Sequence, residues 1–146
     1  MTDVNYSYWA GVVDCDGCIS IEKSVWHKRS RSPVYTLKVG LANTNYNIME
    51  AFKNNTGATQ KIVKRKIRSP KHKQSYGVKV FGKKAYLFLQ KIKEHLIIKK
   101  ERADLAMKFY LYMKPHQHGV KVIEDEQKER ERMYLEMKRM NKRGRD

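Results

Sequence analysis

Asp14 and Asp16 stand at the end of a predicted helix, which is an unfavourable place for acidic side chains. Apolar residues at positions 6, 9, 10 and 13 share one helical face, and after Gly17 the pattern becomes the alternation of a strand. A helix C-terminus carries partial negative charge, so acids placed there without visible compensation indicate a functional site. Carboxylates beside carbonyl dipoles form an oxygen-rich, negative site that suits a hard divalent cation such as Mg²⁺.

Cys15 and Cys18 are the only cysteines and form a Cys-x-x-Cys pair. This spacing suggests zinc or redox chemistry, and His116 and His118 could complete a zinc site. However, no second Cys-x-x-Cys is present, and His-x-His is not the usual zinc-ligand spacing. The alternative interpretation is two small, mostly buried thiols.

The chain is strongly basic. Its 146 residues include 32 Lys+Arg against 15 Asp+Glu, which gives a formal net charge of +17. Such a charge attracts polyanions, first nucleic acid and second an anionic membrane surface. No apolar run approaches the ~20 residues of a membrane span, and the N-terminus does not resemble a signal peptide. We therefore expect an intracellular protein that consists of a single domain over residues 1–146.

Hydrophobic periodicity predicts an α+β fold. After the first helix, residues 18–28 and 35–42 are predicted strands, followed by a short helix that ends near Gly57. Residues 60–68 and 75–80 form a second strand pair, and residues 83–95 form the next helix. The helix with its two strand-strand-helix units occupies residues 1–98, and C-terminal helices occupy residues 99–146.

Basic residues concentrate on the two predicted hairpins. The first turn carries Lys28, Arg29 and Arg31, and the second hairpin carries Lys61, Lys64, Arg65, Lys66, Arg68, Lys71 and Lys73. Charge runs are often only solvated surface, but these lie almost without acids nearby. Two basic hairpins in one sheet predict a saddle for duplex DNA, with affinity that depends steeply on salt.

The residues from Trp9 to Gly17 resemble the LAGLIDADG motif, with Trp9 in place of the first Leu and Cys15 in place of the central Ala. The chain therefore resembles a single-motif LAGLIDADG homing endonuclease. The resemblance implies an α-β-β-α-β-β-α core with a saddle-shaped antiparallel sheet and additional C-terminal helices.

The resemblance also implies roles for the motif acids. Asp16 would bind Mg²⁺, or another divalent cation such as Mn²⁺, next to a scissile phosphate with help from the Cys15 carbonyl. Asp14 is either a second functional acid or a structural acid that accepts hydrogen bonds near the helix end.

Two further residues match positions of the family's site. Asn43 follows the second strand, where the family places a polar residue that positions metal-bound water; the alternative is a loop or cap residue. Lys99 matches a basic residue that stabilises the phosphate or tunes the water. The alternative is that Lys99 or the adjacent Lys100 is ordinary surface.

In the family, the sheet face opposite the helices lies in the DNA major groove. Register from the motif places six residues there: Ser20, Glu22, Ser24, Trp26, Thr36 and Lys38. Trp26 could instead cover the edge of the sheet. In residues 60–68 the pattern leaves two choices open, either Lys61, Val63 and Arg65 or Ile62, Lys64 and Lys66.

The function implied is a site-specific homing endonuclease that makes a metal-dependent double-strand break. One motif supplies one acid, so the resemblance implies a homodimer on a near-palindromic site. The helix from Tyr8 to Val13 would form the interface, with close approach at Ala10 and Gly11. The small residues could instead be core packing, which would leave a monomer.

A non-cleaving nucleic-acid-binding protein of the same fold is the alternative function, either an intron RNA maturase or a DNA-binding regulator. The protein would act wherever the host DNA resides, in a bacterial or phage-infected cytoplasm or in an organelle.

Overall fold

The computed structural model describes residues 5–25, 33–113 and 123–142. Helix α1 (Tyr6–Asp16) begins after Asn5, whose side chain accepts hydrogen bonds from the first-turn amides of Ser7 and Tyr8. The elements that follow are β1 (Gly17–Ser24), β2 (Val34–Asn43), α2 (Tyr46–Thr56), β3 (Val63–Lys64), β4 (Tyr76–Phe81), α3 (Gly82–Ile92), the 3₁₀ turn η1 (Lys93–His95), α4 (Lys100–Tyr112) and α5 (Glu124–Met140). The predicted order of helices and strands is confirmed. In the described ranges, no helix is long and apolar enough to cross a membrane.

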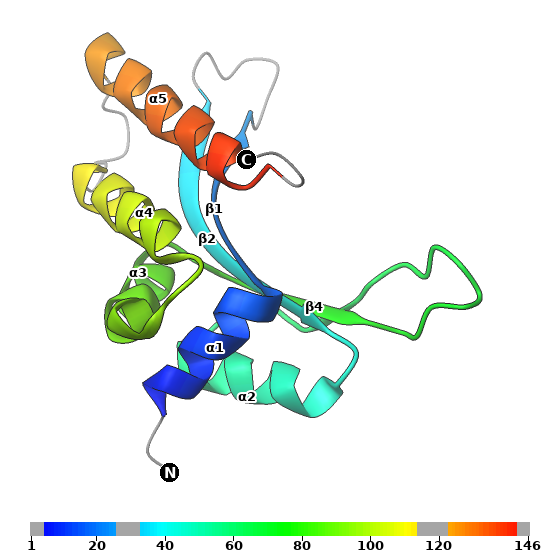
Figure 1. Cartoon of the computed structure of the whole chain (residues 1–146). Coiled ribbons are helices and arrows are strands. Elements are labelled where there is room, and N and C mark those ends of the chain that lie inside the picture. The colour runs from blue at the N-terminus through cyan, green and yellow to red at the C-terminus, as the bar shows by residue number, and fades with distance from the viewer. Residues whose placement is uncertain (1–4, 26–32, 114–122, 143–146) are drawn as a thin grey trace.

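The strands form one antiparallel sheet with the order β1-β2-β4-β3. In Figure 1 the helices lie to one side of the curved sheet, and the hairpin that joins β3 to β4 projects away from them. In the described ranges no helix lies on the other face of the sheet, which we call the open face. This arrangement leaves the open face available to a large partner.

The core lies between the sheet and the helices. The alternation predicted for the strands is confirmed, because Ile19, Ile21, Leu37 and Val39 are at most 4% exposed while their neighbours along each strand are less buried. Phe52 and other large side chains of the helices close the core. Each such side chain contributes roughly 1.5–3 kcal/mol when it is fully buried.

Helix α5 is fixed to the outer end of the β1–β2 hairpin. Glu131 accepts hydrogen bonds from the Tyr35 hydroxyl and from Lys23 Nζ, the latter at 3.0 Å. These two bonds, the Tyr35 bond first, lower the pKa of Glu131. Asn141 Nδ2 also donates to the Ile19 carbonyl at 2.9 Å. The C-terminal helix thereby supports the strands that carry half of the open face.

The predicted strands differ from the observed ones in two places. Only Val63 and Lys64 of the predicted strand over residues 60–68 form a ladder, because this edge strand is crowded with lysine and arginine and its side chains are nearly all exposed. Strand β1 ends at Ser24 rather than at residue 28. Four predicted DNA-binding residues lie outside the described residues: Trp26, Lys28, Arg29 and Arg31.

Two glycines of the motif differ in the space around them, which gives a matched pair of substitutions. A Cβ at Gly17 would lie 2.8 Å from Val13 Cα and 3.0 Å from Val13 O, whereas a Cβ at Gly11 would meet nothing within 4 Å. We expect Gly17→Ala to lower the free energy of unfolding by about 1–3 kcal/mol because the helix-to-strand turn must open. Gly11→Ala should be neutral or stabilising, since Ala favours a helix over Gly by about 1 kcal/mol. Urea unfolding followed by circular dichroism measures both changes, and equal losses would contradict the close approach at Gly17.

Candidate functional site

Asp14 connects the end of α1 to the segment that precedes α4. Its carboxylate accepts hydrogen bonds from the backbone amides of Ile97 at 2.8 Å, Ile98 at 3.2 Å and Lys99 at 3.0 Å. The residue is only 8% exposed. Charged hydrogen bonds of this kind contribute about 1.5–3 kcal/mol each. Asp14 is therefore an acid held by backbone amides near the helix end, which was the structural alternative of the two roles considered.

Lys99 supplies the positive charge that is missing from the end of α1. Its Nζ donates to the Val13 carbonyl at 2.7 Å and to the Gly17 carbonyl at 2.6 Å. An ammonium group is favourable there because helix carbonyls concentrate negative charge at the C-terminus. Burial lowers the pKa of Lys99, and repulsion from Arg102 lowers it further. The unfavourable acids of the motif are thus compensated by a residue distant in sequence.

Asp16 and Asn43 lie together where α1 leads into β1 and where β2 ends. Asn43 Nδ2 donates to Asp16 Oδ2 at 3.1 Å, and Asn43 Oδ1 accepts from the Asn45 amide at 2.8 Å. Asp16 is exposed, in contrast to the buried Asp14. The structure therefore brings Asp16 and Asn43 into contact, and it places Lys99 at the same helix end with its ammonium on carbonyl oxygens.

Asp16 fits a hard divalent cation that also takes water and phosphate ligands. The Asn43 bond uses one carboxylate oxygen, and the Cys15 carbonyl belongs to the last helical turn, where carbonyls have no helical partner. In the described part of the chain, no three His, Cys, Asp or Glu side chains gather closely enough to hold a metal ion by themselves. Mg²⁺ is commonly bound by one or two carboxylates together with waters and substrate phosphates, so a single Asp16 suits it.

The prediction of mostly buried thiols is wrong, because Cys15 and Cys18 are both exposed. Cys15 lies on the outward side of α1, and the alternation of β1 places Cys18 on the open face, so neither faces the core. His116 and His118 lie outside the described residues.

The first two strands present their predicted polar residues on the open face. Ser20 pairs with Lys38 and Glu22 pairs with Thr36, so all four side chains share one face. Ser24 continues the same alternation at the end of β1. Lys38 Nζ lies 4.0 Å from Glu22 Oε1, which pairs the one acid of this row with a cation.

The register of β3 shows which of its residues lie on the open face of the sheet. Val63 pairs with Gly77, which places Val63 and then Arg65 on the open face, while Lys64 pairs with Tyr76. The alternative set is therefore not on the open face, and its Ile62 packs partly against the core.

Lys61 departs from its predicted partners Val63 and Arg65. It lines a separate hollow beside α2, with Glu50 and Lys53. Lys61 precedes the ladder of β3, so the strand alternation does not extend to it.

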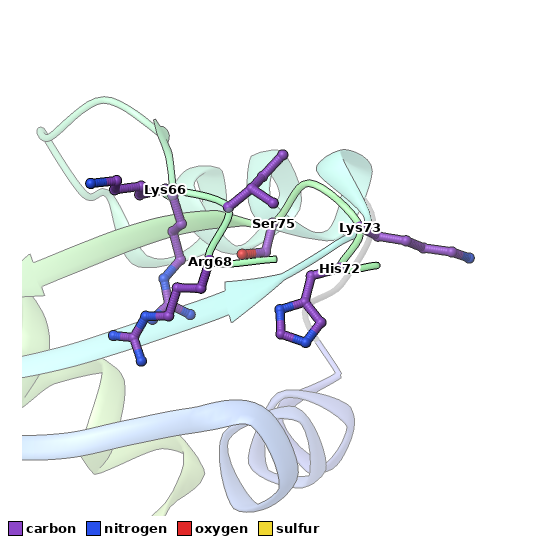
Figure 2. A pocket seen from close by; sticks show the side chains of 7 residues that line it. Lys66, Arg68, His72, Lys73 and Ser75 are labelled. Atoms are coloured by element: carbon purple, nitrogen blue, oxygen red, sulfur yellow. The ribbon is translucent and has the colours of Figure 1, made fainter. Parts of the chain in front are cut away.

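A basic hollow of about 360 Å³ lies in the projecting hairpin. It is lined by Arg65, Lys66, Ile67, Arg68, His72, Lys73 and Ser75. Figure 2 shows Lys66 and Lys73 extending away from each other, while Arg68 and His72 point in a similar direction. Lys71 is exposed on the same hairpin. Most of the predicted basic residues of this hairpin thus surround one concave surface.

A second hollow, of about 310 Å³, joins Asp16 to the open face. Its cations are Lys38, Arg65 and Lys79. Lys79 was missed by the sequence analysis, although its position between the buried Val78 and Val80 would have placed it on this face.

The outward side of α1 differs from the predicted interface. Ala10 has no exposed surface and belongs to the core, so its assignment to a dimer contact is wrong. The exposed residues Tyr8, Gly11 and Cys15 recur at helical spacing on the outward side. The large side chains of Trp9 and Val13 face the core together with Ala10, and they fix which side of α1 points outward.

The two motif acids should respond differently to the same substitution. Asp14→Asn replaces a carboxylate that accepts three amide hydrogen bonds, so we expect the free energy of unfolding to fall by about 1.5–3 kcal/mol. Asp16→Asn changes an exposed group and should cost less than about 1 kcal/mol. Urea unfolding at neutral pH measures both, and a larger loss for Asp16→Asn would contradict the assignment.

Comparisons with known proteins identify the fold. Neither the protein-family models nor the curated proteins gave a match. Among solved structures, the homing endonuclease I-CvuI in complex with its target is 16% identical over 97% of this chain and 85% of that chain, with a TM-score of 0.73. The archaeal intron-encoded homing endonuclease I-Vdi141I, complexed with DNA, is 17% identical over 99% of this chain and 89% of that chain, with a TM-score of 0.75.

The LAGLIDADG homing endonuclease I-LtrWI, bound to target DNA, is 14% identical over 100% of this chain and 47% of that chain, with a TM-score of 0.70. This chain thus spans about half of I-LtrWI and most of the two shorter proteins. The element order, the open sheet and the position of α1 agree with the fold implied by the motif. The chain therefore has the fold of the LAGLIDADG homing endonucleases.

Proposed function

We propose that this protein is a site-specific, metal-dependent endonuclease that cuts duplex DNA as a homodimer. The observation that carries the proposal is the position of Asp16. This exposed carboxylate, oriented by Asn43, lines the same hollow as three cations of the open sheet face. An acid that can hold a divalent cation is thereby adjacent to a surface that can hold phosphates.

The solved structures of similar fold support DNA as the partner. I-CvuI was crystallised with its target and Ca, and I-Vdi141I was crystallised with DNA. The cations Lys38, Arg65 and Lys79 of this chain would attract the duplex backbone. Phosphate contacts of this kind would give binding that weakens as salt rises.

In the proposed mechanism, Asp16 and the Cys15 carbonyl would hold Mg²⁺, or Mn²⁺ in its place. When bound, the ion would lower the pKa of a water and neutralise charge on the attacked phosphate. Asn43 orients the Asp16 carboxylate through its 3.1 Å hydrogen bond and would also position the water.

Lys99 would act mainly as a positioning residue. Its ammonium holds the Val13 and Gly17 carbonyls, on the two sides of Asp16 in sequence. This geometry supports a role in fixing the turn that presents Asp16, in place of direct contact with phosphate. Asp14 would fix the same turn from the other side through residues 97–99.

The homodimer follows from the number of acids that one chain provides. A double-strand break needs a cut on each strand, and one protomer provides one Asp16. The exposed residues Tyr8, Gly11 and Cys15 of α1 offer a helix face on which a second copy can pack. Two-fold symmetry of the protein then requires a near-palindromic target.

Cleavage tests the proposal directly. The substrate is a duplex that joins the sequences on either side of the gene without the gene itself. We expect the parent protein to cut it in Mg²⁺, and we expect Asp16→Asn to reduce the rate by about 100-fold or more. Filter binding in Ca²⁺ should show that Asp16→Asn still binds. Binding without any cutting by the parent would favour a DNA-binding regulator, and preference for RNA over the duplex would favour a maturase.

The two exposed cysteines test the dimer. If α1 packs on a second α1 through its outward side, the two Cys15 thiols lie across the interface. A short bis-maleimide should then give a covalent dimer on denaturing gels with the parent and with Cys18→Ser, and no dimer with Cys15→Ser. Failure of the parent to cross-link at concentrations that allow DNA binding would contradict an α1 interface.

A further inference from the structure

Beside Asp16, the open face of the sheet is formed by residues with very small side chains. Gly40, Ala42 and Gly77 line the hollow there and have almost no side chains. The register aligns Ala42 with Gly77 on adjacent strands, so these small residues are neighbours on one face. Any contact with a ligand that enters this hollow must therefore come from the longer side chains around its edge.

Arg65 is one of the cations at that edge, and hydrogen bonds hold its backbone in place. Its backbone amide donates to the Ser75 carbonyl at 2.9 Å, and its carbonyl accepts from Gln74 Nε2 at 2.8 Å. A Cβ on Gly77 would lie 3.6 Å from Arg65 Cδ and 3.7 Å from its Cγ, so the stem of Arg65 lies over the bare glycine. The absence of a side chain at position 77 thus leaves room for the Arg65 stem, and Arg65 lines the hollow beside Asp16.

The other two cations of the hollow are less suited to read a base. Lys38 lies 4.0 Å from Glu22, which partly neutralises it. Lys79 carries a compact ammonium on a flexible stem and is exposed. A guanidinium presents two parallel N–H groups, which match the O6 and N7 acceptors of guanine in the major groove.

We propose that Arg65 is a specificity-determining residue that recognises a guanine in each half of the target through the small-residue floor of Gly40, Ala42 and Gly77. The inference rests on the proposed function, because it requires the open face to enter the major groove. It assigns to one arginine a role that differs from that of the other cations on the same hairpin.

We assign the remaining cations of the hairpin to contacts with the phosphate backbone of the DNA. Lys66, Arg68 and Lys73 lie beyond the last ladder pair of β3 and β4, around the hollow that contains the Ser75 side chain. Figure 2 shows that the side chains of Lys66 and Lys73 extend away from each other. Such a ring suits phosphate oxygens, which fix the protein on the duplex without conveying sequence.

The different roles of Arg65 and the other hairpin cations can be tested by selecting bound duplexes from a library with a randomised core. The selection uses Ca²⁺ in place of Mg²⁺. The proteins compared are the parent, Arg65→Lys, Arg65→Gln and the matched control Arg68→Gln. The parent should select a guanine at one symmetric position in both halves of its site. Arg65→Gln should lose this preference and keep the other positions, with affinity for the guanine site lower by about tenfold or more. Arg65→Lys should only weaken the preference, because its ammonium can still donate to guanine.

Arg68→Gln should keep the whole selected sequence and bind every duplex more weakly, with a salt slope reduced by about 1 for each phosphate that the protein no longer neutralises. Retention of the guanine by Arg65→Gln would overturn the inference while leaving the endonuclease proposal intact. Loss of the guanine in Arg68→Gln alone would also overturn it. A parent that selects no sequence at all would overturn both this inference and the site-specific function.

Discussion

The structure depends on a tie between the end of α1 and the segment before α4. The Asp14 carboxylate accepts three backbone amides of residues 97–99, and the Lys99 ammonium donates back to the carbonyls of Val13 and Gly17. Each partner satisfies groups that would otherwise be left without hydrogen bonds at a buried helix end. The Lys99 ammonium thereby offsets the negative end of the helix, which lowers the cost of placing a second acid there.

That tie separates the two motif acids. Asp14 is buried and accepts the three backbone hydrogen bonds, whereas Asp16, two residues later, is exposed and contacts Asn43. The turn between them leads directly into β1, so the sheet and the acid are fixed by the same few residues. An exposed acid next to an open, cationic sheet would ordinarily form an ion pair or remain solvated. Here the hollow that Asp16 shares with Lys38, Arg65 and Lys79 is also lined by small residues, which leaves space beside the acid.

The sequence predicted those features that depend on local chemistry. The apolar spacing of α1, the alternation of β2 and the end of α2 at Gly57 are local patterns, and all three are observed. Features set by distant residues were predicted less well. The partner of Asp14 is more than eighty residues away in the chain, and only the fold brings it close.

One wrong prediction and one choice that stayed open both concern the face on which a residue lies. The small residues Ala10 and Gly11 are adjacent in sequence but lie on different sides of α1, one in the core and one outside. In the basic hairpin, alternation is too weak to choose a face because both faces carry charges, and the register comes from the pairing with β4. The face on which Lys79 lies, by contrast, could be predicted from the sequence, because the apolar Val78 and Val80 stand on either side of it.

The most direct measurement is a crystal structure with duplex DNA and Mn²⁺, in which anomalous scattering locates the ion. The account predicts an anomalous peak at coordination distance from Asp16, with Asp14 still bonded to the amides of residues 97–99 and Lys99 still on the two carbonyls. An ion bound to Asp14, with residues 97–99 released, would contradict it.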